Sequence, residues 1–247
     1  MSVVTIVPMP EVRVAPAAEC ARDAADLIID RIDAHDAVIG LATGRTTVAL
    51  HSNLAGAHRA GRIDLRRANW VMLDELLDID AHDPRGFRAG LMRDFVSTFD
   101  PNGASLVGPR LDAGDADSIC ERFARETAGL RPSVQVLGIG RNGHVGFNEP
   151  GSTADSRVRL VNLADSTIAD FDAEQWRGDD PPRRAVTRGI ADISEADTIV
   201  LLAFGAAKAD AVRSMLTDPM STSCPASLLR DHPDLRVFLD AEAARKV

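Results

Sequence analysis

The chain is poor in lysine, in cysteine and in long apolar runs, and each of these features excludes some classes of protein or of binding site. Only two of its 28 basic residues are lysines, Lys208 and Lys246, so arginine stands almost wherever a cation is used. Cys20, Cys120 and Cys224 lie about a hundred residues apart, a spacing that fits neither a disulfide framework nor a metal site. We expect three reduced thiols that serve as small apolar residues.

No segment has the length or composition of a membrane anchor. The longest apolar runs, such as residues 199–204, are far too short to cross a bilayer. The apolar stretch at residues 1–8 lacks the basic start of an export signal. A cytoplasmic protein without a membrane partner is therefore expected.

The charge is acidic and carries no basic stripe. A net charge of −9 without a basic stripe argues against nucleic acid and anionic membranes as partners, because their binding depends on clustered Lys and Arg. An anionic small molecule would need a local positive site. Lys208 is a candidate, because it follows the apolar run 199–204 and because a lysine ammonium meets a phosphate as a point charge.

Short β-branched runs alternate with helix-like segments along the 247 residues, a pattern typical of βαβ units. We expect one domain over 1–247, an α/β fold with a Rossmann-like, open, mostly parallel sheet and helices on both faces. Strands are expected at 3–7, 37–41, 69–73, 134–138, 198–203 and 235–239, and helices at 16–34, 46–60, 114–129 and 206–216. Residues 74–90 and 141–190 do not follow the alternation, and a lid is expected around 160–190.

Ligands of open α/β sheets bind at the carboxyl ends of the strands, so the loops there are the places to search. After strand 37–41 comes Ala42-Thr43-Gly44-Arg45-Thr46, which leads directly into a helix. Free N–H groups and hydroxyls at a helix N-terminus suit a phosphate, but a plain helix cap by Thr43 or Thr46 explains the same residues.

Two adjacent carboxylates, Asp74 and Glu75, follow strand 69–73. A carboxylate that is desolvated at this place serves as a general base. A solvated pair of loop acids is the alternative, because exposed acids are common.

The strongest segment follows strand 134–138 and reads Gly-Ile-Gly-Arg-Asn-Gly-His-Val-Gly-Phe-Asn-Glu-Pro-Gly over residues 138–151. Its glycines imitate a dinucleotide-binding loop, but Pro150 and Gly151 follow soon after and no helix pattern appears. His144 and Glu149 instead indicate an acid–base pair in which the carboxylate orients the imidazole. No third ligand lies nearby, so no metal is expected.

With these residues in place, the sequence resembles the glucosamine-6-phosphate deaminase family nearly from end to end. The similar elements are residues 42–46, Leu-Asp-Glu at 73–75, the segment 138–151, and Phe-Gly-Ala-Ala-Lys-Ala at 204–209. The related 6-phosphogluconolactonases share the glycine-rich turn and the histidine but not Phe-Asn-Glu-Pro at 147–150. That tetrapeptide favours the deaminase.

The resemblance implies a cofactor-free conversion of glucosamine 6-phosphate and water to fructose 6-phosphate and ammonia. Asp74 would move a proton between C2 and C1, and His144 would open the pyranose ring with Glu149 and Asn142 as partners. The phosphate would be held by Thr43, Gly44, Thr46 and Lys208.

Three features distinguish this chain from other members of the family. Asn142 is asparagine where other members carry aspartate or asparagine, so His144 has one fewer anionic neighbour than in an aspartate-bearing relative. The segment 168–173 lacks the arginine that the family's lid places on the phosphate, and we hypothesise that Arg45 supplies the missing charge. Arg159 matches the allosteric arginine of regulated members, but Val161 replaces the allosteric lysine.

Activation by N-acetylglucosamine 6-phosphate is therefore not expected. The missing lysine and the short end after Leu239 also do not favour a regulated hexamer. Two other functions stay open: a lactonase or a deaminase of a different amino-sugar phosphate, and a non-catalytic regulator that binds a sugar phosphate.

Overall fold

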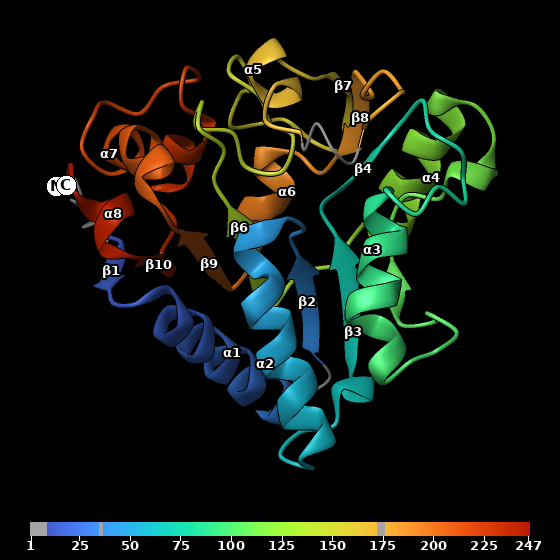
Figure 1. Ribbon diagram of the computed structural model, residues 1–247, viewed down its shortest axis with the longest axis horizontal. Helices are drawn as coiled ribbons and strands as arrows, with labels where there is room; N and C mark the ends of the chain where they lie inside the picture. The colour runs from blue at the N-terminus through green and yellow to red at the C-terminus, as the bar shows by residue number, and fades with distance from the viewer. Residues whose placement is uncertain (1–8, 35–36, 172–175) are drawn as a thin grey trace, which may run out of the picture.

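A seven-stranded parallel sheet forms the centre of the computed structural model, which describes residues 9–34, 37–171 and 176–247 (Figure 1). The strand order is β1-β10-β9-β6-β2-β3-β5. The bounds are β1 Glu11–Val14, β2 Ala37–Leu41, β3 Ala68–Met72, β5 Leu106–Val107, β6 Val134–Gly138, β9 Thr198–Ala203 and β10 Leu235–Leu239. The expected open, mostly parallel α/β sheet is confirmed.

The central strands were predictable because both faces of the sheet are covered. β9 is buried at all six positions, and β2, β6 and β10 are buried at nearly all, so each reads as a continuous apolar run. The two edge strands were missed. β1 is exposed along its whole length and β5 has two residues, so neither produces an apolar run. The strand expected at 3–7 lies outside the described residues.

The described residues form eight α-helices, of which α8 follows the last strand. They are α1 Ala17–Ala34, α2 Val48–Arg59, α3 Phe87–Asp94, α4 Ala116–Thr127, α5 Asp165–Ile168, α6 Ile190–Ser194, α7 Ala209–Leu216 and α8 Ala241–Ala244. The connections through α1 and α2 run toward β5, and those through α6 and α7 run toward β1. Since parallel crossovers are right-handed, these two pairs of helices cover opposite faces of the sheet.

A second, antiparallel sheet stands over the carboxyl ends of the parallel strands (Figure 1). It consists of β4 Asp74–Leu76, β8 Arg184–Thr187 and β7 Arg159–Asn162, in that order. Residues 141–190, for which the sequence predicts long loops, short helices or a lid, therefore also contain two strands, β7 and β8, and β8 pairs with β4. Strands of three or four residues among glycines and prolines leave little periodicity in the sequence.

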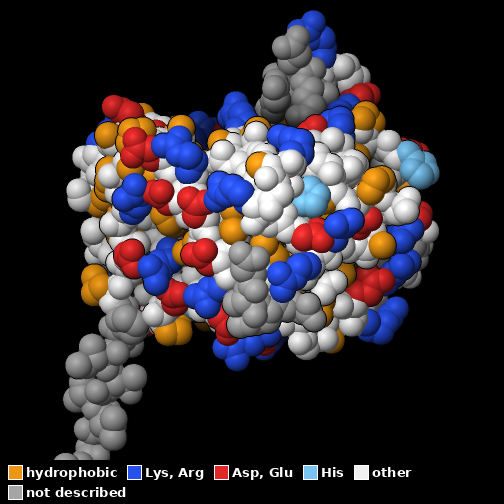
Figure 2. All heavy atoms as spheres, turned by 90° about the horizontal axis from the view of Figure 1, so that it is seen from below, with side chains coloured by type: hydrophobic (Ala, Val, Ile, Leu, Met, Phe, Trp, Pro, Cys, Tyr) orange, Lys and Arg blue, Asp and Glu red, His pale blue; other side chains and the backbone are white. Residues whose placement is uncertain are grey.

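The face at the amino ends of the parallel strands, opposite the second sheet, carries arginines and acidic side chains intermingled (Figure 2). No patch of one charge dominates this view, in agreement with the absence of a basic stripe in the sequence. Among the described residues, no helix is both long enough and apolar enough to span a bilayer.

Candidate active site

The strand order reverses between β2 and β6, because the chain leaves β2 toward β3 but leaves β6 toward β9. The crevice at such a switch point is the usual ligand site of an open α/β sheet. A cavity of about 430 Å³ opens there. Seven residues singled out from the sequence line it together: Thr43, Gly44, Arg45, Thr46, Asp74, His144 and Lys208.

Asp74 is the first residue of β4 and is only 6% exposed. Burial, and then the negative charge of Glu75, raise the pKa of Asp74 to about 8. Its carboxyl lies close to the backbone of Gly146, where an added Cβ would be 3.3 Å from Asp74 Oδ2. A carboxyl held in this way and facing a cavity is suited to take up and release a proton near neutral pH.

Glu75 has a different place, although it is the next residue. Its side chain accepts backbone N–H bonds from Leu76, Phe87 and Arg88 at 2.9, 2.7 and 2.7 Å. Phe87 and Arg88 begin α3, so Glu75 satisfies free N–H groups at that helix N-terminus. The pair of acids thus consists of a cavity carboxyl, Asp74, and a structural one.

His144 contacts a carboxylate of the same segment, Glu149. Its Nδ1 lies 3.5 Å from Glu149 Oε2 and 3.2 Å from the hydroxyl of Thr167. Asn142 Nδ2 donates to the same Glu149 oxygen at 2.8 Å. With Nδ1 engaged on this side, Nε2 is the ring nitrogen left for a ligand.

Glu149 is kept ionised by these contacts. Burial alone would raise the pKa of Glu149, but the hydrogen bond and charge of His144, with hydrogen bonds from Thr167 and Asn142, lower it below its usual value. Ala164 N–H adds a bond to the other carboxylate oxygen at 3.3 Å. Asn142 and Glu149 do not line the cavity and stand behind His144.

Gly140 explains why the turn needs a glycine. A Cβ at position 140 would lie 2.3 to 2.6 Å from three ring atoms of His144, so the imidazole packs directly on the backbone there. The turn is closed by two backbone bonds, Gly140 N–H to the His144 carbonyl and Gly143 N–H to the Gly140 carbonyl. The glycines therefore fix the imidazole, which is a different role from approaching a pyrophosphate.

Two cations, Lys208 and Arg45, line the same cavity as these groups and form what we call its cationic wall. Lys208 ends a 3-10 turn, Ala206–Lys208, that follows Gly205, and Arg45 begins a matching turn, Arg45–Thr47, that follows Gly44. Gly44 and Gly205 have φ angles of 105° and 87°, which a side chain rarely adopts. Burial, then the positive charges of Arg141 and Arg45, lower the pKa of Lys208. An anion would relieve this repulsion.

Three further polar residues line the cavity without having been predicted from the sequence. Arg141, Thr167 and Asp170 line the cavity, and Thr167 contacts His144 directly. Arg141 is a cation within the segment 138–151, and this position could have indicated a residue of the cavity from the sequence alone. Thr167 and Asp170 lie in or after a four-residue helix, and only tertiary structure brings them to the site.

Arg159 forms two side-chain hydrogen bonds to the segment 148–152. Its guanidinium donates to Asn148 Oδ1 at 2.8 Å and to Ser152 Oγ at 2.7 Å, and it is half-buried. It therefore braces the turn after Phe-Asn-Glu-Pro. Among the described residues, no group of acidic, histidine or cysteine side chains has the arrangement of a metal site.

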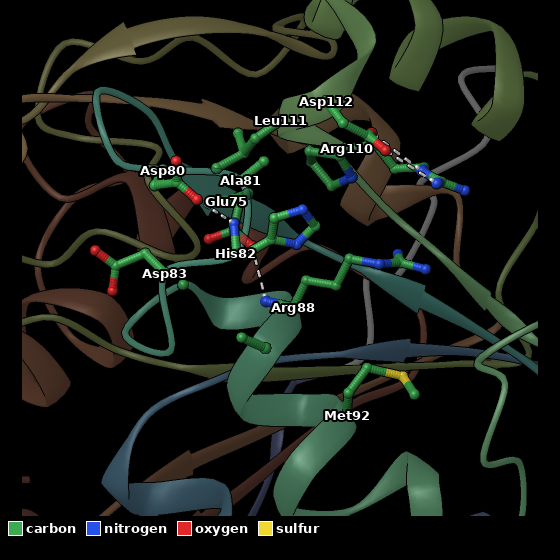
Figure 3. Close-up of a pocket in the computed structure, with 13 residues that line it drawn as sticks. Glu75, Asp80, Ala81, His82, Asp83, Arg88, Met92, Arg110, Leu111 and Asp112 are labelled. Atoms are coloured by element: carbon green, nitrogen blue, oxygen red, sulfur yellow. Dashed lines mark hydrogen bonds and ion pairs between the residues drawn. The ribbon is translucent and has the colours of Figure 1, made fainter.

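A second cavity, of about 310 Å³, lies on the other side of Glu75. Figure 3 shows Glu75 with the Arg88 amide bonded to it, and the ion pair of Arg110 with Asp112 farther along the wall. The Arg88 side chain donates to the Leu106 carbonyl at 3.3 Å. Asp74 and His144 do not line this cavity, so it lacks the acid–base groups of the first.

A family model and individual relatives all relate this chain to glucosamine-6-phosphate isomerases or deaminases. The model of the family described as glucosamine-6-phosphate isomerases/6-phosphogluconolactonase matches residues 13–237. A glucosamine-6-phosphate deaminase of Cellvibrio japonicus is 39% identical, over 94% of this chain and 89% of its own length. One from Shewanella loihica is 38% identical, over 93% and 87%.

Solved structures agree with the fold. A monomeric glucosamine-6-phosphate deaminase superposes with a TM-score of 0.91 at 34% identity, covering 96% of this chain and all of that one. The 6-phosphogluconolactonase of Trypanosoma brucei has a TM-score of 0.78 at 21% identity, covering 96% and 98%, and is similar in fold.

Proposed function

The chain belongs to the family of glucosamine-6-phosphate isomerases and 6-phosphogluconolactonases, and from this membership we propose that it is a glucosamine-6-phosphate deaminase. It is an enzyme that converts glucosamine 6-phosphate and water to fructose 6-phosphate and ammonia. The observation that carries the proposal is the buried carboxyl of Asp74, which shares one cavity with His144 and a cationic wall.

The reaction begins with opening of the pyranose ring. His144 takes the proton from the C1 hydroxyl and returns a proton to the ring oxygen O5, so that the C1–O5 bond breaks and an aldehyde forms. Glu149 accepts the hydrogen bond of His144 Nδ1 and stabilises the charged imidazolium during this transfer. Asn142 supports the step by holding Glu149.

Asp74 performs the isomerisation on the open sugar. Its carboxylate removes the proton from C2 while the aldehyde oxygen O1 takes up a proton from solvent, giving an enolamine, and its carboxylic acid then delivers the proton taken from C2 to C1. The product is an imine at C2, which water hydrolyses to the ketone and ammonia. A pKa near 8 serves both halves, because the same group must accept and then donate the proton.

The cationic wall holds the phosphate end of the sugar. Thr43, Gly44, Thr46 and Lys208 all line the cavity. The backbone N–H groups after Gly44, the two hydroxyls and the ammonium are donors that suit a phosphate. Arg45 is exposed at its edge and adds charge. None of the steps above uses a cofactor.

Arg45→Gly tests the contribution of that edge charge. We expect KM for the sugar phosphate to rise severalfold, by about three- to tenfold, with kcat nearly unchanged, because an exposed cation adds binding but touches no reacting atom. An unchanged KM would remove Arg45 from the site.

The remaining expectations about setting follow from the same proposal. The enzyme works on a small molecule as a single unit spanning 1–247, in the cytoplasm, without nucleic-acid or membrane partners. Regulation as an allosteric hexamer is not favoured, because Arg159 braces a turn and position 161 carries valine.

Release of ammonia from glucosamine 6-phosphate tests the proposal directly. Wild type is expected to release ammonia, and Asp74→Asn to lose about a hundredfold or more of the rate, since an amide cannot take up the proton. Hydrolysis of 6-phosphogluconolactone, followed in parallel, is expected to be absent. Lactone hydrolysis without ammonia would replace the deaminase by a lactonase, and full activity of Asp74→Asn would remove Asp74 as the base.

A further inference from the structure

An ion pair between Arg141 and Asp170 closes one side of the active-site cavity. Arg141 Nε donates to Asp170 Oδ2 at 2.9 Å, and a second guanidinium nitrogen donates to Asp170 Oδ1, so the contact is two-pronged. Both residues line the cavity together with Lys208. Asp170 follows α5, which lies above the carboxyl end of β6 in Figure 1, so the pair joins two segments 29 residues apart.

Arg141 belongs to the cationic wall through its charge. It is the first positive group, after burial itself, that lowers the pKa of Lys208, and Arg45 is the second. Within residues 9–34, 37–171 and 176–247, no ion pair is formed by Lys208 or Arg45. Of these three cations, Arg141 is therefore the one that a carboxylate already neutralises.

A carboxylate and a phosphate present the same pair of oxygens to a guanidinium. Both accept two parallel N–H bonds from one arginine, and a phosphate carries more charge. Asp170 therefore occupies, on Arg141, the place that a phosphate would take. The side chain of Arg141 is 52% exposed and that of Asp170 is 29% exposed, so exchange needs no rearrangement of the core.

We propose that Arg141 is a ligand of the substrate phosphate, and that Asp170 holds this position in the free enzyme and is displaced when the sugar phosphate binds. The proposal rests on the proposed function, because it concerns the phosphate of that same substrate. Segment 168–173 includes no cation. In this proposal Arg141 supplies a positive charge for the phosphate in its place. Asp170 acts as a competitor built into the chain.

The competition has a calculable size. Exposed ion pairs contribute about 0.2 to 1 kcal/mol, which corresponds to a factor of up to about five in affinity. Removing Asp170 should therefore tighten phosphate binding by about two- to fivefold. Removing Arg141 should weaken it by about tenfold or more, since a charge-assisted bidentate contact is lost.

Inorganic phosphate titrated into the purified enzyme by calorimetry measures these effects without turnover. Asp170→Asn should bind phosphate more tightly than wild type, and Arg141→Ala more weakly. In the double variant, Arg141→Ala with Asp170→Asn, the gain from the second change should vanish. KM for glucosamine 6-phosphate should follow the same order in all four proteins, while kcat changes less than KM.

Asp78→Asn is the matched control. Asp78, just after β4, pairs with Arg184 of β8 by a similar bond within the second sheet, but it does not line the cavity. Its phosphate affinity should equal that of wild type. An equal gain in Asp78→Asn, or a gain from Asp170→Asn that persists without Arg141, would overturn the proposal.

The test separates this inference from the function on which it rests. If wild type released no ammonia but phosphate affinities followed the stated order, the deaminase would fail and the phosphate ligand would stand. If ammonia were released and phosphate affinity were unchanged in Arg141→Ala, the phosphate ligand would fail and the deaminase would stand.

Discussion

The raised pKa of Asp74 makes the free energy of unfolding depend on pH, and this dependence can be measured. The pKa of Asp74 is raised from 3.8 to about 8 on folding, so the folded protein keeps the proton longer than the unfolded chain does. Stability from this group is then complete at low pH and is lost as the pH rises toward 8. Asp74→Asn removes the ionisation and should remove that loss.

Between pH 6.5 and 8 the effect of Asp74 on the free energy of unfolding can be separated from that of His51. Below it, His51 works in the opposite direction, because burial lowers the pKa of His51 from 6.5 to about 4 and stability rises as the pH passes through that range. Between pH 6.5 and 8, a carboxyl with the stated shift costs about 1.5 kcal/mol of unfolding free energy, at about 1.4 kcal/mol per proton and pH unit. Asp74 is 6% exposed, so solvent screening reduces this little.

Urea unfolding at pH 6.5, 7.25 and 8 gives the necessary free energies. Between the first and the last pH, wild type should lose about 1.5 kcal/mol more than Asp74→Asn does. Asp180→Asn, which makes the same chemical change at an exposed loop residue, should follow wild type. Parallel curves for wild type and Asp74→Asn would refute the buried, high-pKa carboxyl, and with it the account of the base.

Gly140→Ala should lower kcat by about a hundredfold, because the new Cβ would lie 2.3 Å from the ring of His144 and would displace it. Gly56→Ala, in α2 and outside the cavity, where only the end of the Arg59 side chain lies within 4.0 Å, should keep its activity, and equal losses in both variants would contradict the packing argument. Glu75→Gln should shift the acid limb of the kcat/KM profile to lower pH, because the charge of Glu75 helps to raise the pKa of Asp74. It should also cost about 2 kcal/mol in urea unfolding, since charged acceptors of backbone N–H groups are lost, and an unmoved acid limb would show that burial alone sets that pKa.

The parallel sheet was predictable because its central strands are buried on both sides. The runs at 37–41, 134–138, 198–203 and 235–239 match the strands residue for residue. Loops that follow such strands meet at one edge, so the sequence could also name the cavity residues after β2, β3, β6 and β9. Their order along the chain was enough, since parallel strands point their ends the same way.

The second sheet and the lid contacts could not be predicted in this way. β4, β7 and β8 are short, and their stability comes from pairing with each other rather than from an apolar pattern. Thr167, which contacts His144, and Asp170, which contacts Arg141, lie shortly after β7 in the chain. No local spacing in the sequence encodes a contact across more than twenty residues.

By itself the sequence determined the sheet, the catalytic turn at 138–151 and the set of acids and cations from which the site is made. The tertiary structure decided how the environments, and therefore the pKa values and the hydrogen bonds, of these acids and cations differ. It buried Asp74 and gave Glu75 three backbone donors, because one faces the cavity and the other faces the start of α3. It also set Asp170 against Arg141. Burial and charge pairing arise from neighbours distant in the chain, and these set the chemistry of a side chain as much as its identity does.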